Sequence, residues 1–200
     1  MPDDTTPRPN LNTYWVVPHK FLAGEYPGDE DPAKAREKIN RFLGAGVRHF
    51  VDLTEFDELV PYEAILSEES RAASITATYQ RFPIRDVSVP SDASHLAEIL
   101  FTIDRRIRQG GAVYLHCWGG VGRTGLVVAC WLQEHGRTPE AALEELSTLW
   151  KTTEKSAWRE SPETPEQVDW VKTWPQRRRS VQKLMLCDLY RGAIAGVGRW

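Results

Sequence analysis

The segment between residues 112 and 132 constrains the fold of this chain more than any other part of its sequence. Residues 112–115 form a short apolar run that favours a buried strand, and residues 126–132, LVVACWL, are apolar on every side of a helix. The residues between these two runs are rich in glycine, so the chain can turn sharply. A buried strand that leads directly into a buried helix needs a sheet with helices packed on it, and the segment therefore predicts an α/β domain.

The rest of the chain alternates between strand-like and helix-like runs. Asp31, Asp92 and Thr138 are suitable helix caps, and each precedes a run whose apolar residues have helical spacing. Proline directly follows Asp31 and Thr138. Strands are expected at residues 14–17, 21–23, 47–53 and 76–82, and helices at residues 31–44, 61–73, 92–109, 139–150 and 164–174. This order is typical of a central, mostly parallel sheet that is flanked by helices on both faces.

Length and charge suggest a domain organisation and exclude some partners. The chain has 200 residues, 41% of them hydrophobic, which suits one domain with a real core. We expect a disordered N-terminal lead over residues 1–12, a domain over residues 13–175 and a basic, small-residue tail over residues 176–200. The net charge of −3 gives no overall positive field, so neither nucleic acid nor an anionic membrane is an expected partner.

The cysteines argue against a disulfide framework and against a metal site. Cys117, Cys130 and Cys187 are odd in number and widely spaced, without the spacing of metal ligands. Residues 1–10 are polar and proline-rich and lack the apolar run of a signal peptide, and no segment is long and apolar enough to span a membrane. We therefore expect a cytoplasmic protein that needs no cofactor or metal.

The chemistry is carried by residues 115–125, LHCWGGVGRTG. A tight glycine-rich loop with inward N–H groups at a helix N-terminus binds a tetrahedral oxyanion, and its positive field favours a thiolate at Cys117. Arg123 can hold two phosphate oxygens with its planar guanidinium, and Thr124 can place a hydroxyl near the sulfur. The segment predicts a phosphate-handling site with Cys117 as nucleophile. A glycine-rich turn around a core cysteine is the structural alternative.

This segment resembles the signature loop of the protein tyrosine phosphatase superfamily, in which His-Cys is followed by five residues, Arg, and Ser or Thr. It is most similar to the small dual-specificity type, where an aromatic residue and two glycines can follow the cysteine. The resemblance implies a tyrosine-phosphatase-like fold and a phosphocysteine intermediate. It also implies a phosphate-binding loop made of Trp118, Gly119, Gly120, Val121, Gly122 and Arg123.

The resemblance also implies a general acid on a separate loop. Residues 81–86, RFPIRD, followed by Pro90, are similar to the acid loop of small dual-specificity phosphatases, where an Asp follows a Pro-Ile pair by one residue. Asp86 is thereby assigned as the acid that protonates the leaving oxygen and then activates water. The alternative is a loop aspartate that caps a turn.

Three further positions receive supporting roles. By the same resemblance, His116 orients the loop and tunes the thiolate, and Gln167 resembles the glutamine that positions the hydrolytic water. A helix cap by Thr164, with Gln167 at the third helical position, is a sufficient alternative. Trp118 either lines the mouth of the pocket or packs against a helix.

Three acidic residues, Asp52, Glu55 and Asp57, lie where the expected strand over residues 47–53 runs into a loop. The carboxyl ends of parallel strands face the site in α/β folds. We expect a solvated acidic loop there, with contact to substrate or to Arg123 as the alternative.

These observations predict a phosphomonoester hydrolase that acts on phosphotyrosine, phosphoserine or phosphothreonine in proteins. Phosphatases of inositol polyphosphates usually place lysines in the signature loop, whereas this loop has only Arg123 as a charge. A phosphatase of a small phosphorylated metabolite, such as an inositol phosphate, is the alternative, and an inactive phosphate-binding module is a further one. We expect a monomer whose partner is a phosphorylated protein or a small phosphorylated substrate.

Overall fold

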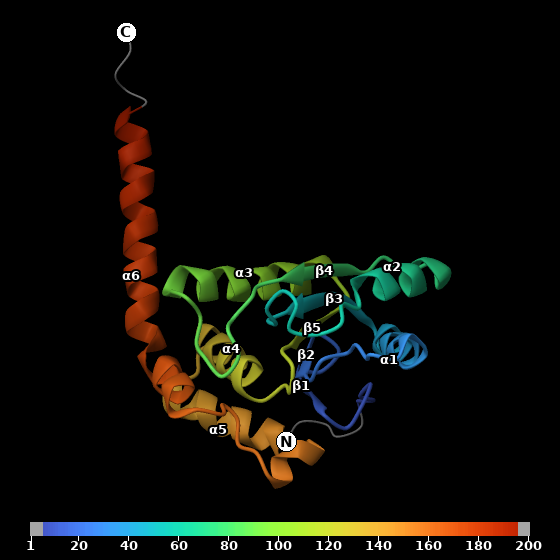
Figure 1. The fold of residues 1–200 in the computed structure, drawn as a ribbon. Coiled ribbons are helices and arrows are strands. Elements are labelled where there is room, and N and C mark those ends of the chain that lie inside the picture. The colour runs from blue at the N-terminus through green and yellow to red at the C-terminus, as the bar shows by residue number, and fades with distance from the viewer. Residues whose placement is uncertain (1–5, 196–200) are drawn as a thin grey trace.

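The computed structural model describes residues 6–195, with side chains for residues 6–181, and confirms the predicted α/β class (Figure 1). Five strands form one sheet in the order β1-β2-β5-β3-β4. The strands are β1 (Thr13–Val17), β2 (Phe21–Gly24), β3 (Val47–Asp52), β4 (Thr78–Arg81) and β5 (Ala112–His116). β1 runs antiparallel to β2, and all other neighbours are parallel, so the sheet is mostly parallel as predicted.

Six α-helices and one short 3-10 helix accompany the sheet in the described part of the chain. They are α1 (Pro32–Gly44), α2 (Glu63–Ala72), α3 (Ala93–Gln109), α4 (Gly122–Glu134), α5 (Pro139–Trp150), η1 (Glu154–Ala157) and α6 (Pro165–Ala195). Side-chain oxygens of Asp31, Asp92 and Thr138 accept backbone N–H bonds at the starts of α1, α3 and α5. These three caps lie where the sequence placed them.

The sheet has a separate hydrophobic core on each face. Phe50 and Tyr114 point to one face and pack with side chains of α1 and α2. Val51, Val113 and Leu115, which alternate with them along the strands, point to the other face and pack with α3, α4, α5 and α6. α4 is buried from its first residue to Leu132, because it packs against the sheet on one side and against α5 and α6 on others.

The N-terminal residues differ from the prediction of a disordered lead over residues 1–12. Within residues 6–12, Nη1 of Arg8 donates to the carbonyl oxygens of Thr13 and Thr152 at 2.8 and 3.0 Å. These contacts hold the segment against the start of β1 and the loop after α5. Residues 1–5 lie outside the described residues.

The last helix is longer than the sequence predicted. It was expected to end near Trp174, but α6 continues through Pro175 to Ala195 and extends beyond the sheet (Figure 1). Proline removes one helical hydrogen bond, yet residues 176–191 contain neither glycine nor a second proline that would stop the helix. The predicted tail over residues 176–200 is therefore helical as far as it is described, and residues 196–200 lie outside that part. None of the helices over residues 6–195 is both long and apolar enough to cross a bilayer.

Candidate active site

The glycine-rich loop lies where the central strand β5 runs into α4. β5 ends at His116 and α4 begins at Gly122, so Cys117 directly follows the strand. Cys117 is only 3% exposed and forms part of the floor of a cavity of about 420 Å³. The residues that line the cavity are Asp86, Val87, Cys117, Trp118, Gly119, Val121, Gly122, Arg123, Lys155, Trp158, Arg159, Glu163 and Gln167. The structure therefore brings most of the predicted site residues together around one cavity.

Two glycines are required by close approaches of the loop. Gly120 has a φ of 76°, and a Cβ there would lie 2.5 Å from the backbone carbon of Gly24. A Cβ at Gly122 would lie 2.8 Å from the side-chain amide of Gln167. No side chain fits either position without a shift of the backbone or of Gln167. The sequence pattern is thus explained by packing of the loop against β2 and against the start of α6.

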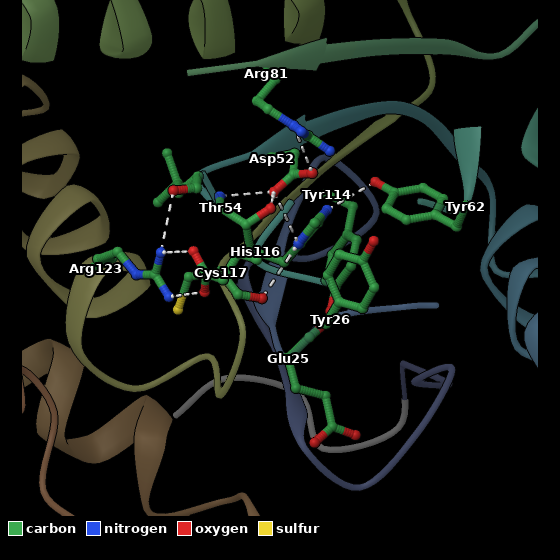
Figure 2. Close-up of polar contacts among 12 residues, drawn as sticks. Glu25, Tyr26, Asp52, Thr54, Tyr62, Arg81, Tyr114, His116, Cys117 and Arg123 are labelled. Atoms are coloured by element: carbon green, nitrogen blue, oxygen red, sulfur yellow. Dashed lines mark hydrogen bonds and ion pairs between the residues drawn. The ribbon is translucent and has the colours of Figure 1, made fainter. Parts of the chain in front are cut away.

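Arg123 is a buried cation at the floor of the cavity, beside Cys117 (Figure 2). Its Nη1 donates to Oε2 of Glu58 at 2.8 Å and to the carbonyl of Ile84 at 3.0 Å, and its Nη2 donates to Oε1 of Glu58 at 2.6 Å. Burial opposes the charge of Arg123, but the Glu58 hydrogen bonds and the nearby Cys117 sulfur outweigh it and raise the pKa of Arg123 above its ordinary value.

The predicted acid, Asp86, reaches the same guanidinium from the loop after β4. Its Oδ1 forms an ion pair with Nη2 of Arg123 at 2.7 Å, and its side chain is 43% exposed. Among the described residues, Nε of Arg123 has no hydrogen-bond partner, so one N–H group of the guanidinium is free. A phosphate that binds this free Nε–H and the Nη2–H group facing Asp86 would take the place of Asp86 on the arginine.

Glu58 is a site residue that the sequence reasoning missed. The sequence offered Asp52, Glu55 and Asp57 as possible partners of Arg123, and the partner in the structure is the next carboxylate in the same loop. The backbone N–H of Glu55 donates to Oε2 of Glu58 at 2.9 Å and holds it in place. Although partial burial opposes its charge, the hydrogen bond from Arg123 holds the pKa of Glu58 below its usual range.

Asp52 lies instead in a buried polar group behind Cys117. It is fully buried at the end of β3, paired in register with His116 of β5 and with Arg81 of β4. Its oxygens accept hydrogen bonds from Thr54 and from the hydroxyl of Tyr79. The prediction that Asp52 belongs to a solvated acidic loop is therefore wrong, because the carboxylate is enclosed between neighbouring strands.

His116 is buried directly before Cys117 and contacts three polar groups. Nε2 lies 2.7 Å from Oη of Tyr62, and Nδ1 lies 3.3 Å from the carbonyl oxygen of Cys117 and 3.8 Å from Oδ1 of Asp52 (Figure 2). Burial lowers the pKa of His116, and Asp52 offsets only part of this effect. The ring is thus a neutral structural link between β5, β3 and the loop.

Two other predicted residues have clear environments. Thr124 is buried, and its Oγ1 has no hydrogen-bond partner among the residues the structure describes. A buried hydroxyl without a partner is unusual, and it remains available to a group that enters the loop. Trp118 is 58% exposed and lines the cavity, which agrees with a place at the mouth and not with packing against a helix.

Gln167 lies in the first turn of α6 and lines the cavity. Its backbone N–H donates to Oγ1 of Thr164 at 3.1 Å, while its Oε1 accepts from the backbone of Glu163 and Thr164. Its Nε2 donates to the carbonyl of Ser88 at 2.9 Å, which links α6 to the loop of Asp86. The capping arrangement is therefore present, and it holds the amide next to Gly122 of the glycine-rich loop.

The segment around η1 contributes cavity residues that no sequence signal indicated. Lys155 donates from Nζ to the carbonyl of Gly119 at 3.2 Å and forms an ion pair with Glu25 at 2.7 Å. Trp158, which is 70% exposed, and Arg159 lie nearby on the cavity wall. Within residues 6–181, no cluster of His, Cys, Asp and Glu has the arrangement of a metal site.

Comparison with protein families gives one match over most of the chain. The family model described as "Swiss Army Knife protein, DSP-PTPase phosphatase domain" (PTP-SAK) matches residues 10–171. A protein of Invertebrate iridescent virus 3 named "Putative tyrosine phosphatase 067L" is 31% identical over 123 residues, which cover 59% of this chain and 44% of that protein. "Putative tyrosine phosphatase 197R" of Invertebrate iridescent virus 6 is 30% identical over 145 residues, which cover 70% of this chain and 48% of that protein. The chain spans less than half the length of these curated relatives.

Solved structures of similar shape are also phosphatases. The active form of Tk-PTP superposes with a TM-score of 0.62 at 23% identity, covering 83% of this chain and 97% of the other. Kinase associated phosphatase, solved with its catalytic-site cysteine changed to serine, superposes with a TM-score of 0.62 at 20% identity. The match covers 78% of this chain and 85% of the other. PTPMT1 in complex with PI(5)P superposes with a TM-score of 0.60 at 19% identity, and the match covers 84% of this chain and 98% of the other. At these identities the likeness establishes the fold.

Proposed function

Because the chain belongs to the DSP-PTPase phosphatase family, we propose that it dephosphorylates proteins through a phosphocysteine intermediate on Cys117. The observation that carries the proposal is the placement of three groups around one cavity: the Cys117 sulfur on the floor, the Arg123 guanidinium beside it, and the Asp86 carboxyl on the wall. These groups are a nucleophile, a binder of phosphate oxygens and a proton donor, which together suffice for hydrolysis of a phosphomonoester.

In the proposed reaction the Cys117 thiolate attacks phosphorus while the bond from phosphorus to the leaving oxygen breaks. Once phosphate has displaced Asp86 from Arg123, the Asp86 carboxyl group gives its proton to that oxygen. In the second step water attacks phosphorus, Asp86 takes the proton of the water, and the bond from sulfur to phosphorus breaks. Inorganic phosphate and the thiolate are released, and the Arg123 guanidinium holds the equatorial oxygens in both steps.

The mouth of the cavity favours a substrate with a flat ring. Val87, Trp118 and Trp158 are large apolar side chains that line the cavity and are more than half exposed, whereas Cys117 and Arg123 on the floor are almost fully buried. Exposed apolar groups that gather around one opening mark a binding surface. A phosphotyrosine side chain can reach the floor and place its ring against the two tryptophans, so we propose phosphotyrosine as the preferred protein substrate.

The Cys117→Ser variant tests the mechanism. A phosphotyrosine peptide should be turned over by the wild type and not by the variant, while binding of inorganic phosphate is retained because the loop amides remain. Acid quenching of the wild type during turnover should leave a phosphoryl group on the peptide that contains Cys117, detectable by mass spectrometry. Turnover near the wild-type rate in the serine variant would refute the mechanism. A wild type that binds phosphate but hydrolyses no substrate would support an inactive binding module instead.

The Trp158→Ala variant tests the preference for phosphotyrosine. Its kcat/KM for a phosphotyrosine peptide should fall roughly tenfold, the range for loss of a stacked aromatic contact, while a phosphothreonine peptide is affected less. Phe101→Ala is the matched control, since Phe101 is also a largely exposed aromatic residue and lies on α3, away from the cavity. Equal losses for both peptides would contradict the proposed preference.

A small phosphorylated metabolite is the second candidate, and Lys155 favours it. The phosphate loop contains no lysine, but the fold brings Lys155 from η1 to the rim of the same cavity. A cation there can bind a second anionic group of a substrate. If this candidate is correct, Lys155→Met should lower kcat/KM for an inositol bisphosphate by at least about tenfold and leave phosphotyrosine nearly unchanged.

A further inference from the structure

The buried carboxylate of Asp52 has more partners than a structural ion pair needs. Oδ1 accepts from the backbone N–H and the hydroxyl of Thr54 at 2.8 and 2.7 Å, and Oδ2 accepts from the hydroxyl of Tyr79 at 2.7 Å. Nε of Arg81 lies 3.4 Å from Oδ2. A buried charge is costly unless it is paired and hydrogen-bonded, and here these contacts offset that cost. Burial opposes ionisation, but the hydrogen bonds from Tyr79 and Thr54 favour the charged carboxylate, and the pKa of Asp52 lies below its ordinary value.

The charge of Asp52 faces the residue that precedes the nucleophile. Because β3 and β5 are neighbouring parallel strands, Asp52 and His116 are register partners, and Oδ1 lies 3.8 Å from Nδ1 of the imidazole (Figure 2). Arg81 lies on the opposite side of the carboxylate, on β4. Asp52 is thus placed between a cation that balances it and a ring that it can orient.

The contacts of His116 determine which ring nitrogen carries the proton. Nδ1 faces two groups that only accept hydrogen bonds, the carbonyl oxygen of Cys117 at 3.3 Å and the Asp52 carboxylate. Nε2 faces the hydroxyl of Tyr62 at 2.7 Å, which can donate. A neutral imidazole satisfies all these groups only with its proton on Nδ1. The opposite tautomer would place these two acceptors against an Nδ1 that has no proton to give.

We propose that Asp52 is a positioning residue of the phosphatase reaction, which acts through His116 on the carbonyl of Cys117. The carboxylate holds the ring in the Nδ1–H tautomer, and the Nδ1–H group holds the Cys117 carbonyl at the point where β5 turns into the phosphate loop. The orientation of the loop amides and of the sulfur depends on this carbonyl, because a peptide plane is rigid. This inference rests on the proposed function, since it assigns Asp52 a part in that reaction.

The test is the Asp52→Asn variant, which keeps the shape of the side chain and removes its charge. We expect a roughly tenfold fall in kcat with little change in KM for a phosphotyrosine peptide, which is the lower end of the range for removal of a group that orients a metal-ligating histidine. Histidine-selective ¹⁵N NMR should show His116 as the Nδ1–H tautomer in the wild type and as a tautomer mixture in the variant. A merely structural carboxylate would not change that spectrum.

Asp104→Asn is the matched control, because it also removes the charge of an aspartate that lies beside a histidine. Asp104 accepts from Nε1 of Trp131 at 2.8 Å and lies 3.4 Å from Nε2 of His135, away from the cavity. The control should keep both the wild-type kcat and the His116 signal. Wild-type kcat and an unchanged His116 tautomer in Asp52→Asn would overturn the proposal.

The proposal stays testable if Asp52→Asn does not fold. An Nε2–H tautomer of His116 in the wild type would overturn it without any variant. Tyr79→Phe, which keeps the Asp52 charge but removes one hydrogen bond to it, should retain the Nδ1–H tautomer, and loss of the tautomer there would count against the role of the charge. The NMR result does not depend on turnover, so failure of the positioning role and failure of the phosphatase function can be told apart.

Discussion

The guanidinium of Arg123 and the carboxylate of Glu58 lie edge to edge, with each terminal nitrogen bonded to a different oxygen, at 2.8 and 2.6 Å. Such a two-point contact fixes the plane of the guanidinium as well as its position. Arg123 is 1% exposed, so its charge has little water to compensate it. Glu58 therefore holds the arginine in a plane that leaves Nε and one Nη2–H group directed away from the pair.

Glu58→Gln should weaken both the fold and the reaction. An amide cannot accept at both of its terminal atoms, so one bond to the buried cation is lost, and we expect a loss of about 1–3 kcal/mol in the free energy of unfolding. The loss should shrink in saturating inorganic phosphate, because a bound oxyanion compensates the arginine. Urea unfolding with and without phosphate measures both effects.

The matched control for this change is Glu68→Gln. Glu68 pairs with Arg36 on the surface, where both side chains are about half exposed, so the free energy of unfolding should change little. If Glu58→Gln and Glu68→Gln had the same free energy of unfolding, Glu58 would have no role in holding Arg123.

Arg123→Lys should be almost as damaging to turnover as Arg123→Ala. A lysine supplies the charge, but its ammonium cannot bridge both oxygens of Glu58 while it holds two phosphate oxygens. We expect kcat/KM of the lysine variant to lie at least about a hundredfold below the wild type, as for loss of a stabilising donor at a transition state. A lysine variant within about tenfold of the wild type would argue against two-point binding of phosphate.

The sequence was informative where short-range patterns decide the structure. The caps at Asp31, Asp92 and Thr138, the buried helix after Gly122 and the succession of strands and helices along the chain all depend on residues close together in the sequence. The loop from Cys117 to Arg123 could also be recognised from its own residues, although Gly120 and Gly122 are required by close approaches to Gly24 and Gln167, which are distant in the sequence.

The sequence was less informative where two distant segments meet. Glu58 could not be distinguished from Glu55 and Asp57, since all three are carboxylates in one loop and only the path of that loop selects the partner of Arg123. Lys155 and Trp158 reach the cavity because the segment after α5 returns to the glycine-rich loop, and no local sequence pattern indicates this contact.

Stability should fall as the protein is acidified from about pH 7.5 to about pH 5.5. Burial lowers the pKa of both His49 and His116, so the folded chain takes up protons on these rings less readily than the unfolded chain does. Protonation below the ordinary histidine pKa of about 6.5 therefore favours the unfolded state. The lowered pKa values of Asp52 and Glu58 act in the same direction, but only at more acidic pH.

Urea unfolding at the two pH values measures this change, and an NMR titration assigns it. The His116 ring should stay neutral in the folded protein well below pH about 6.5, because no water reaches it to compensate a charge. Protonation of His116 at or above that value, or equal stability at the two pH values, would contradict the assignment.

Asp86→Asn should have opposite effects on turnover and on phosphate binding. Turnover should fall by roughly 10²–10³, the usual range for the loss of a general acid. The loss should be largest for alkyl phosphates such as phosphoserine, whose leaving oxygen needs a proton, and smaller for an activated aryl phosphate. Parallel assays of the two substrates with the same variant measure the difference.

Binding of inorganic phosphate to the free enzyme should become tighter in the same variant. In the wild type the Asp86 carboxylate occupies Nη2 of Arg123 at 2.7 Å, and phosphate must displace this charge before it can bind the guanidinium at two points. The neutral amide of asparagine competes less well for the arginine, and it repels the phosphate dianion less. Calorimetric titration of phosphate into both proteins gives the comparison. If phosphate binds more weakly and both substrates are hydrolysed at wild-type rates, Asp86 serves only to hold the loop after β4, and the proton donor must be another group.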